Sequence, residues 1–386
     1  MNMLERVASD HVIQWRRHIH QYPELSYKEV ETTRYIESIL DQFDGITHKR
    51  LNTTGVVATL QGAQPGKHIA LRADIDALPI EEESDVTFPS QHPGIMHACG
   101  HDAHTAMLLG AVEVLAGMKE SIQGTITFIF QAAEEVPPGG AKELVDLGVL
   151  DEVDFVFGLH VAPTIPVGYT ALMPGFVTAA SDTFHITIKG KGAHGSTPDL
   201  SVDPIMIGAD IISSINNIVS RTVSPLDKAV ISFGEFHAGQ ASNIIPDTAK
   251  LSGTVRTTRP EMRQHVKEQI HRIVSHVCEM YGADVDLFYH EGYSAIDNDP
   301  LATEIAHEAI SKVIDPKCIL EIDPLMGSED FSAYTDVRPG AFFILGSGVE
   351  SEGCGYINHH PKFKINEDCL PLGSALHAQI ALDALN

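Results

Sequence analysis

Short apolar runs alternate with segments of helical periodicity over the first 178 residues of the chain. Apolar residues recur every three or four positions in segments 4–18 and 26–43, which predicts two helices, with QYPELS ending the first and capping the second. A further helix is predicted over about 102–118. The runs VVATLQG, HIALRADID, TITFIFQ and DFVFGLHV read as strands, and the last two are as apolar as strands buried on both faces of a mainly parallel sheet. This order predicts an α/β layer structure.

The middle of the chain follows a different order. Strands are predicted at DTFHITIKG, AVISFGEFH, AKLSGTVRT and ADVDLFYH, with helices over 202–221 and 261–281. The resulting βαββαβ order is that of a ferredoxin-like domain. It is inserted, because the α/β pattern returns with a helix over 301–313, the strand AFFILG and a helix over about 368–385. We therefore expect one domain from residues 1–180 and 291–386, and an inserted domain from residues 181–290.

Composition limits the partners that the chain can have. A formal net charge of −26 argues against nucleic acid and anionic membranes, which an acidic surface repels. No apolar run approaches the roughly 20 residues that span a bilayer, and the N-terminal segment resembles neither a signal peptide nor a transit peptide. The five cysteines are odd in number and widely spread, which fits a reducing compartment. We expect a cytoplasmic protein.

The stretch MHACGHDAHT concentrates metal-binding side chains in a run of small residues. Cys99 and His101 are two positions apart, so in an extended or tightly turned backbone they point to the same side. Thiolate and imidazole groups together are ligands for a transition metal.

Further polar groups follow predicted strands, where open α/β sheets place their sites. Asp74 and Asp76 end one strand, and the adjacent Glu134 and Glu135 end another. One of two adjacent carboxylates can bind metal while its neighbour takes a proton from water; the alternative is a pair of exposed loop acids. A donor set sufficient for two divalent ions, if one ligand bridges them, would comprise Cys99, His101, Glu135, His160 and one of His359 and His360.

Taken together, RADIDALP, MHACGHDAHT, FQAAEE, GAHGSTP and HHPKF resemble the M20 metallopeptidase clan. The similarity is to its subfamily D, the branch of aminoacylases, hippurate hydrolases and auxin-conjugate amidohydrolases, and RRHIHQYPELS and SEDFS extend it over the whole chain. The resemblance implies a zinc-exopeptidase-like sheet domain with an inserted lid or dimerisation domain. It also implies Glu134 as general base and metal ligation by Cys99, His101, Glu135, His160 and His359. His359 is preferred to His360 because the family histidine lies two residues before a proline, here Pro361.

One position departs from better-known M20 peptidases. Their ligand histidine two residues before an aspartate is replaced here by Asp74, while Asp76 keeps the aspartate, so ligation is expected to pass to Cys99 with His101. The metal could then be Zn²⁺, Mn²⁺, Ni²⁺ or Co²⁺. We expect Asp74, Asp76 and Asp102 to orient ligands through hydrogen bonds.

The inserted domain supplies candidates for substrate binding. The resemblance implies that His194 and Asn243 reach the substrate carbonyl, often in the active site of a partner subunit, and stabilise the oxyanion. Arg256 is a candidate for pairing with the substrate carboxylate, or a plain salt-bridging residue. Since family members often dimerise through this domain, a homodimer or higher homo-oligomer is expected.

The sequence thus predicts a dinuclear metal-dependent amidohydrolase that cleaves N-acyl-L-amino acids. In the expected reaction Glu134 deprotonates a bridging water that attacks the acyl carbonyl, and then returns the proton to the leaving amine. Three alternatives stay open within the same chemistry: an N-acetyl-diaminopimelate deacetylase, a dipeptidase, or a hydrolase of aryl-acyl conjugates. The alternative outside that chemistry is a non-catalytic metal or amino-acid binding protein, which would have lost the base or an open metal position. A purely structural zinc protein would use a closed set of four nearby ligands.

Overall fold

The computed structural model describes residues 2–349, 351 and 353–386, and the chain divides into two compact units. The first unit comprises Met1–Val177, Ile296–Asp323 and Asp330–Asn386; the second comprises Thr178–Ala295 and Pro324–Glu329. Each has its own hydrophobic core.

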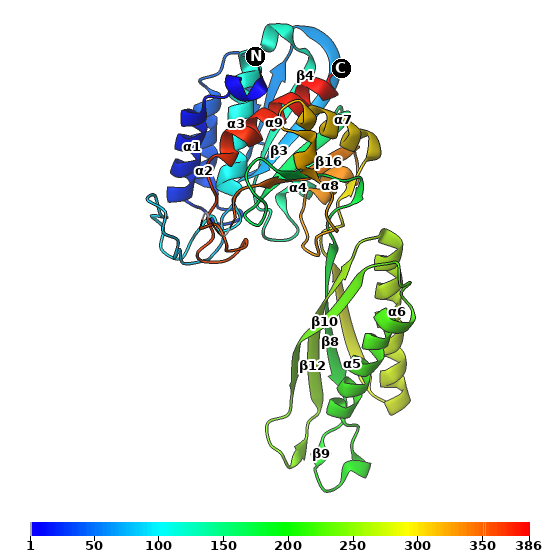
Figure 1. Ribbon diagram of the computed structural model, residues 1–386. Helices are drawn as coiled ribbons and strands as arrows, with labels where there is room; N and C mark the ends of the chain where they lie inside the picture. Colours follow the sequence, from blue (N-terminus) through cyan, green and yellow to red (C-terminus); the bar gives the residue numbers. More distant parts are fainter. Residues whose placement is uncertain (1, 350, 352) are drawn as a thin grey trace. The chain divides into compact units, whose positions relative to one another are not determined.

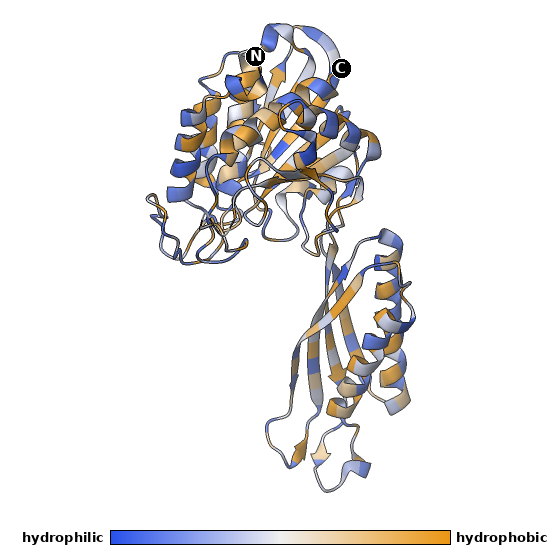
Figure 2. Cartoon of the chain, in the orientation of Figure 1, coloured by the Kyte–Doolittle hydropathy of each residue, from blue (hydrophilic) through white to orange (hydrophobic). Residues whose placement is uncertain are grey.

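A mixed, mainly parallel sheet forms the centre of the first unit (Figure 1). Its four central strands are mutually parallel and run in the order β4 (Gln123–Gln131), β3 (Gln64–Asp74), β5 (Phe155–Ala162) and β16 (Gly340–Gly346). The flanking strands are β2 (Val56–Gln61) and β1 (Ile46–Lys49) beside β4, and β6 (Thr170–Ala171) and β15 (Ile319–Leu320) beside β16. The central strands are strongly apolar (Figure 2), which confirms the predicted fold class.

Helices cover both faces of this sheet. The larger core lies under α1 (Ser9–Gln21), α2 (Val30–Leu40), α3 (His101–Ala116), α7 (Pro300–Ser311) and α9 (Cys369–Ala384), and a smaller core lies under α4 (Gly140–Asp146) and α8 (Ser332–Thr335). Helix α3 is apolar nearly all round and almost wholly buried, as expected of a helix enclosed by other helices and the sheet. Minor elements are η1 (Met3–Arg6), η2 (Lys119–Ser121), η4 (Pro316–Cys318) and the paired β7 (Gly175–Phe176) and β14 (Asp297–Asn298).

The helix expected over 26–43 begins later than predicted, at Val30. Tyr27 has a φ of 64°, in the left-handed region that a right-handed helix cannot include. The Ser26 hydroxyl does not cap the helix but donates to Asp76 Oδ2 at 2.6 Å. The prediction that QYPELS caps α2 is therefore wrong, because a tertiary contact takes the capping residue. The first predicted helix is likewise divided into η1 and α1.

The second unit has the predicted βαββαβ order. Its elements are β8 (Ala180–Lys189), α5 (Pro204–Arg221), β10 (Ala229–Ala238), β12 (Thr248–Thr257), α6 (Pro260–Tyr281) and β13 (Asp284–Glu291), with short β9 (Ala193–His194), η3 (Pro198–Leu200) and β11 (Ile244–Ile245). The antiparallel sheet order β10-β12-β8-β13 is ferredoxin-like. Ile207, Ile211 and Ile215, at helical spacing on α5, share one core with alternate residues Phe184 and Ile186 of β8.

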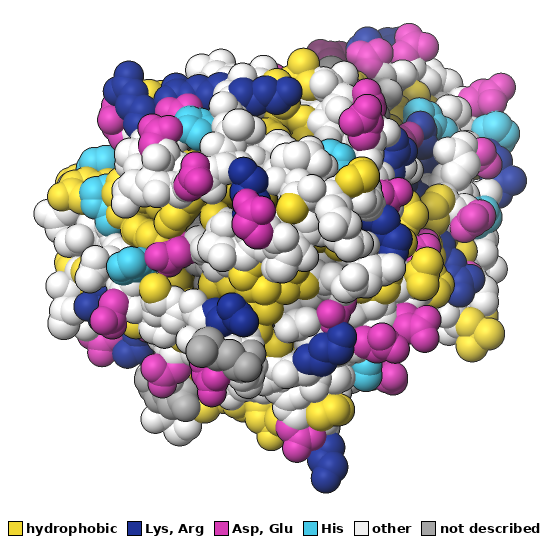
Figure 3. Space-filling view, turned by 90° about the horizontal axis from the view of Figure 1, so that it is seen from above, with side chains coloured by type: hydrophobic (Ala, Val, Ile, Leu, Met, Phe, Trp, Pro, Cys, Tyr) yellow, Lys and Arg dark blue, Asp and Glu magenta, His cyan; other side chains and the backbone are white. Residues whose placement is uncertain are grey.

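Charged side chains of both signs are interspersed on the face shown in Figure 3 rather than gathered by sign. Across the described residues, no helix is both long enough and apolar enough to cross a membrane.

Candidate functional site

The turn before α3 presents Cys99 and His101. Gly100 is the N-cap of α3 with a φ of 94°, and a Cβ at this position would lie 2.5 Å from Val161 Cγ2. Only glycine fits both constraints, so the backbone can turn sharply between the two flanking side chains. Both side chains are buried, with exposed fractions of 7% for Cys99 and 0% for His101.

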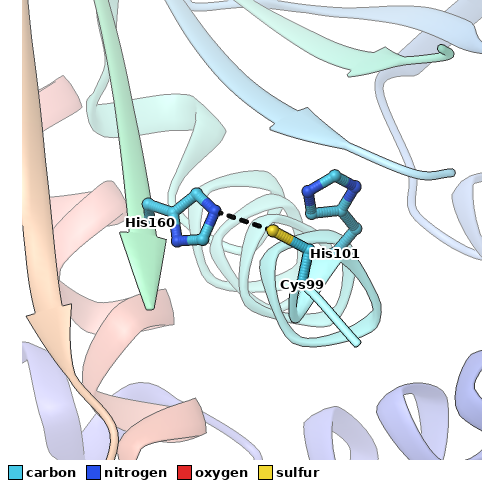
Figure 4. A group of neighbouring side chains, drawn as sticks. All are labelled: Cys99, His101 and His160. Carbon is cyan, nitrogen blue, oxygen red and sulfur yellow. Dashed lines mark hydrogen bonds between the residues drawn. The ribbon is translucent and has the colours of Figure 1, made fainter. Parts of the chain in front are cut away.

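His160, on β5, approaches this turn from the sheet. Its Nδ1 donates to the Val161 carbonyl at 2.8 Å, since a carbonyl can only accept. Its Nε2 therefore has a lone pair, and this atom lies 3.4 Å from Cys99 Sγ (Figure 4). Burial, aided by His104, lowers the pKa of His160 to about 3, so the imidazole is neutral, as a metal ligand must be. Burial, with Glu135 nearby, raises the pKa of Cys99 well above its usual value.

His101 is oriented by a carboxylate. Its Nδ1 lies 3.1 Å from Asp76 Oδ1, while its buried Nε2 has no hydrogen-bond partner within the described chain. Burial opposes protonation of this ring, but Asp74 and Asp76 outweigh it and raise the pKa of His101 to about 10. Asp76 Oδ2 also accepts from the Glu135 backbone N–H at 3.1 Å. Asp76 thus holds one candidate ligand by its ring and another by its backbone.

The turn after β4 carries the two adjacent glutamates. Single carboxylate oxygens of Glu134 and Glu135 and a ring nitrogen of His101 all lie within 4.8 Å of one another. Glu135 Oε1 also lies 3.1 Å from His359 Nε2. His359, with a φ of 69°, is anchored by a bond from its N–H to the Ala98 carbonyl at 2.8 Å.

The neighbouring His360 turns to another partner. Its ring stacks on Tyr356 at 4.3 Å between centroids, and its Nδ1 accepts from the Lys362 N–H at 3.0 Å. The structure therefore brings His359, and not His360, to Glu135.

These donors suit divalent cations. Three groups of residues share members, and within each group the donor atoms lie within 4.8 Å of one another. The groups are Cys99, His101 and His160; Cys99, Glu135 and His359; and His101, Glu134 and Glu135. Among the described residues, His101 Nε2 is buried without a hydrogen-bond partner, which is costly unless a ligand satisfies it. Cys99, His101 and Glu135 each belong to two of these groups, so the groups adjoin one another.

Asp74 belongs to a buried network beside these donors, with its Oδ2 3.7 Å from His101 Nε2. Its Oδ2 accepts from Arg72 Nη1 at 2.7 Å, and its Oδ1 lies 2.6 Å from His104 Nδ1. His104 Nε2 accepts from the Val161 N–H at 2.9 Å, so Nδ1 carries the proton and donates to Asp74. Burial opposes ionisation of Asp74, but His101, His104 and Arg72 together lower its pKa. The sequence analysis did not predict roles for Arg72 and His104. Arg72 lies two residues before Asp74 on the same strand, and His104 lies three residues after His101 on the same helix, and these spacings are the signals that point to them.

Asp102 connects α3 to α1. Its Oδ2 accepts from Arg16 Nε at 2.7 Å and lies 2.8 Å from His20 Nδ1. Although burial opposes it, these cations lower the pKa of Asp102. The hydrogen bonds shown for Asp102 thus orient the first turn of α3, and through it His101, rather than contact a candidate ligand directly.

His194 and Asn243 meet within the second unit. Strand β9 pairs with β11 so that His194 faces Ile244, and the Gly195 N–H donates to the Asn243 carbonyl at 2.8 Å. His194 Nδ1 accepts from the Ser196 N–H at 3.1 Å, which leaves Nε2–H as a donor in the neutral ring.

Arg256 lies in the four-stranded sheet of the second unit, on β12 opposite Ser181. Its Nη1 donates to the Val255 carbonyl at 3.2 Å. The bidentate partner of the nearby Asp182 is Arg263, with Nε and Nη2 at 3.0 and 2.5 Å from Oδ1. No ion pair involving Arg256 is found in the described part of the chain.

Overlapping metal-capable groups beside adjacent carboxylates, at the carboxyl edge of a mainly parallel sheet, are typical of metal-dependent hydrolases. Residues 70–383 match peptidase family M20/M25/M40. The chain belongs to this family and is a hydrolase that acts on amide bonds, which confirms the resemblance seen in the sequence.

Individual relatives agree with this assignment. The chain is 41% identical over 384 residues to thermostable carboxypeptidase 1 of Saccharolobus solfataricus, covering 99% of this chain and 97% of that one. It is 43% identical over 296 residues to an N-acyl-L-amino acid amidohydrolase of Geobacillus stearothermophilus, covering 77% and 80%. A solved dinuclear metal-binding M20 peptidase of Bacillus subtilis superposes with a TM-score of 0.86 at 36% identity, covering 98% of both chains.

Proposed function

We propose that this M20 amidohydrolase cleaves the amide bond of N-acyl-L-amino acids with the help of two divalent cations. The observation that carries the proposal is the overlap of the three donor groups, with Glu134 beside the shared donor Glu135. The cations would be held by Cys99, His101, Glu135, His160 and His359. The similarity to an N-acyl-L-amino acid amidohydrolase and to a dinuclear metal-binding peptidase supports this assignment.

The proposed reaction assigns proton transfer to Glu134. Bound divalent cations supply Lewis acidity, which polarises an acyl carbonyl and makes water more acidic. Glu134 accepts a proton from the attacking water as the new C–O bond forms. It then delivers that proton to the amine nitrogen as the C–N bond breaks. The products are a carboxylate and a free amino acid.

Second-unit residues are proposed to bind the substrate. His194, with Nε2–H available as a donor, and Asn243 would stabilise the developing oxyanion. Arg256 would pair with the substrate carboxylate. Substitution of either His194 or Asn243 should then lower kcat more than it raises KM, because the oxyanion forms only in the transition state.

The experiment that tests the function compares Glu134→Gln with the wild type on N-acetyl-methionine and hippurate. Loss of the base should lower kcat by about 10²- to 10⁴-fold, while the metal content per chain stays unchanged. Glu152→Gln, at an exposed acid outside the donor groups, is the matched control and should keep wild-type activity. Wild-type turnover by metal-loaded Glu134→Gln would refute the proposed mechanism.

The acyl group and the amino acid are separate questions within the same chemistry. N-acetyl-diaminopimelate, dipeptides and aryl-acyl conjugates are the alternatives, and pocket differences of one methylene change selectivity by only about 1–3 kcal/mol. A substrate panel assayed with the protein loaded in turn with Zn²⁺, Mn²⁺, Ni²⁺ and Co²⁺ would separate them. We further propose a cytoplasmic homodimer or higher homo-oligomer.

A further inference from the structure

The segment 24–29, between α1 and α2, contacts the site at several points. Leu25 forms a β-bridge with Ala77, and the Ser26 hydroxyl donates to Asp76, the residue that orients His101. The Tyr27 hydroxyl donates to the Val136 carbonyl at 3.3 Å, just beyond the two adjacent glutamates. The segment therefore packs against the turn that carries Glu134 and Glu135.

Glu29, the last residue of this segment, has a carboxylate in an unusual place. It is fully buried and is the N-cap of α2, where a carboxylate normally accepts from the first helical N–H groups. This one makes no such bond. Its Oε1 accepts from the Ala133 N–H at 2.8 Å, and its Oε2 accepts from the Thr54 hydroxyl at 2.9 Å. Burial raises the pKa of Glu29 to about 7, so the fold tolerates a carboxyl in a site unfavourable to its charge.

Ala133 is the residue on which this carboxylate acts. Its φ is 56°, in the left-handed region that alanine rarely adopts. Its carbonyl accepts from the Gly140 N–H at 3.2 Å, so both polar backbone groups of Ala133 are bound. Glu134 follows directly, and the conformation of Ala133 sets the direction in which the chain presents Glu134 and Glu135 to His101.

We propose that Glu29 is a positioning residue: through the Ala133 N–H it holds the turn after β4 in the left-handed conformation that places the carboxylates of Glu134 and Glu135 beside His101. The effect expected on catalysis rests on the proposed function, whereas the effect expected on cation binding does not. Glu29 would touch neither substrate nor cation.

The test uses Glu29→Met, which keeps the length of the side chain but removes both acceptors, and Glu29→Gln, which keeps one. Co²⁺ bound to the full-length protein is the probe, read by its visible absorption spectrum and by titration. Glu29→Met should weaken Co²⁺ binding at least 10-fold, change the spectrum and lower kcat at least 10-fold. Glu29→Gln should keep most of the Co²⁺ affinity, the spectrum and the kcat of the wild type.

Glu24→Ala is the matched control. Glu24 lies in the same segment, but its Oε2 accepts from the Thr32 N–H at 2.8 Å and from the Thr32 hydroxyl, so it binds α2 and not the turn. This variant should lower the unfolding temperature while leaving the Co²⁺ spectrum and kcat near wild type. A purely structural role of Glu29 would make Glu29→Met behave like Glu24→Ala, and that result would overturn the proposal.

If Glu29→Met does not fold, Glu29→Asp decides the question. Its carboxylate is one methylene shorter and cannot reach Ala133 and Thr54 together, so the Co²⁺ spectrum and kcat should shift in the direction expected for Glu29→Met. An unchanged spectrum and kcat would refute the proposal. Failure of the proposed function would look different, because wild-type protein would then bind Co²⁺ without hydrolysing N-acyl amino acids, and the spectral test of Glu29 would still stand.

Discussion

Three histidines near Cys99, the buried His101 and His104 and the half-buried His160, all form a hydrogen bond through Nδ1, and they differ in whether Nε2 also has a partner. The Val161 carbonyl accepts from His160 Nδ1, and Asp76 accepts from His101 Nδ1, so in the neutral form of each ring Nε2 is the atom left for a cation. His104 differs, because its Nε2 already accepts a hydrogen bond from the Val161 N–H. His104 therefore serves Asp74 and not the donor set, although it lies one helical turn from His101.

At the residue scale, these environments predict that cation binding releases protons. The pKa of Cys99 is raised well above its usual value by burial, and that of His101 is raised to about 10, so both groups carry protons at pH 7.5 in the cation-free protein. A bound cation must displace them, so we expect about two protons released per chain and an affinity that rises with pH across the neutral range. Calorimetry in buffers of different ionisation enthalpy measures the number of protons released on binding. Cys99→Ala should lower it by about one, and equal values for both proteins would contradict the prediction.

At the element scale, three parallel strands bring most of the site together. The carboxyl ends of β3 and β4 carry Asp74 and Glu134, and β5 carries His160 near its carboxyl end; parallel neighbours end at the same edge of a sheet. Helix α3 completes this edge with His101 in its first turn. The geometry of the site therefore depends on how sharply the chain turns at Gly100.

Gly100→Ala should disrupt that turn. A methyl group would lie 2.5 Å from Val161 Cγ2, and a φ of 94° is unfavourable for alanine, so we expect destabilisation of about 1–3 kcal/mol and a lower metal content after dialysis. Gly117→Ala, at the other end of α3, is the control. Gly117 has a helical φ of −64°, and a Cβ added there would have no contact closer than 3.5 Å, so the stability of the Gly117→Ala protein should be unchanged or higher. Thermal unfolding and metal analysis that failed to separate the two variants would refute this account of Gly100.

The candidate ligands at the edge of the sheet could be predicted from the sequence because the signals for them are local. Cys99 and His101 lie two residues apart, and Glu134 and Glu135 directly follow an apolar strand, so spacing and strand ends sufficed to group them. Glu29 could not be recognised in this way, because it looks like an ordinary residue at the start of a helix, and its role depends on a bond to the distant Ala133.

The same reason explains the misplaced start of α2. The pattern of 26–43 suits a helix throughout, and only the contacts of Ser26 and Tyr27 with the sheet edge exclude its first turn. Local pattern thus predicts the elements and the residues at their ends, while long-range contacts decide which of those residues support the site.

At the scale of the whole molecule, the candidate substrate-binding residues of the second unit lie far apart. His194 pairs with Ile244 of β11, which precedes β12. Arg256 lies eight residues beyond Thr248, the first residue of β12, and by strand rise these eight residues span roughly 26 Å. A substrate of dipeptide size spans only about 7 Å. If His194 and Arg256 contact one substrate molecule, we therefore expect them to come from two different chains of an oligomer.

This sharing predicts complementation between inactive variants. His194→Ala removes the proposed oxyanion donor and Glu134→Gln removes the proposed base, so each homodimer should be inactive. A mixed dimer would combine an intact His194 from one chain with an intact Glu134 from the other in one of its two sites. Random exchange would make half of the dimers mixed, with half of their sites intact, so about a quarter of wild-type activity should return. Differently tagged subunits would show that exchange has occurred, and proven exchange without recovered activity would mean that His194 and Glu134 act within one chain.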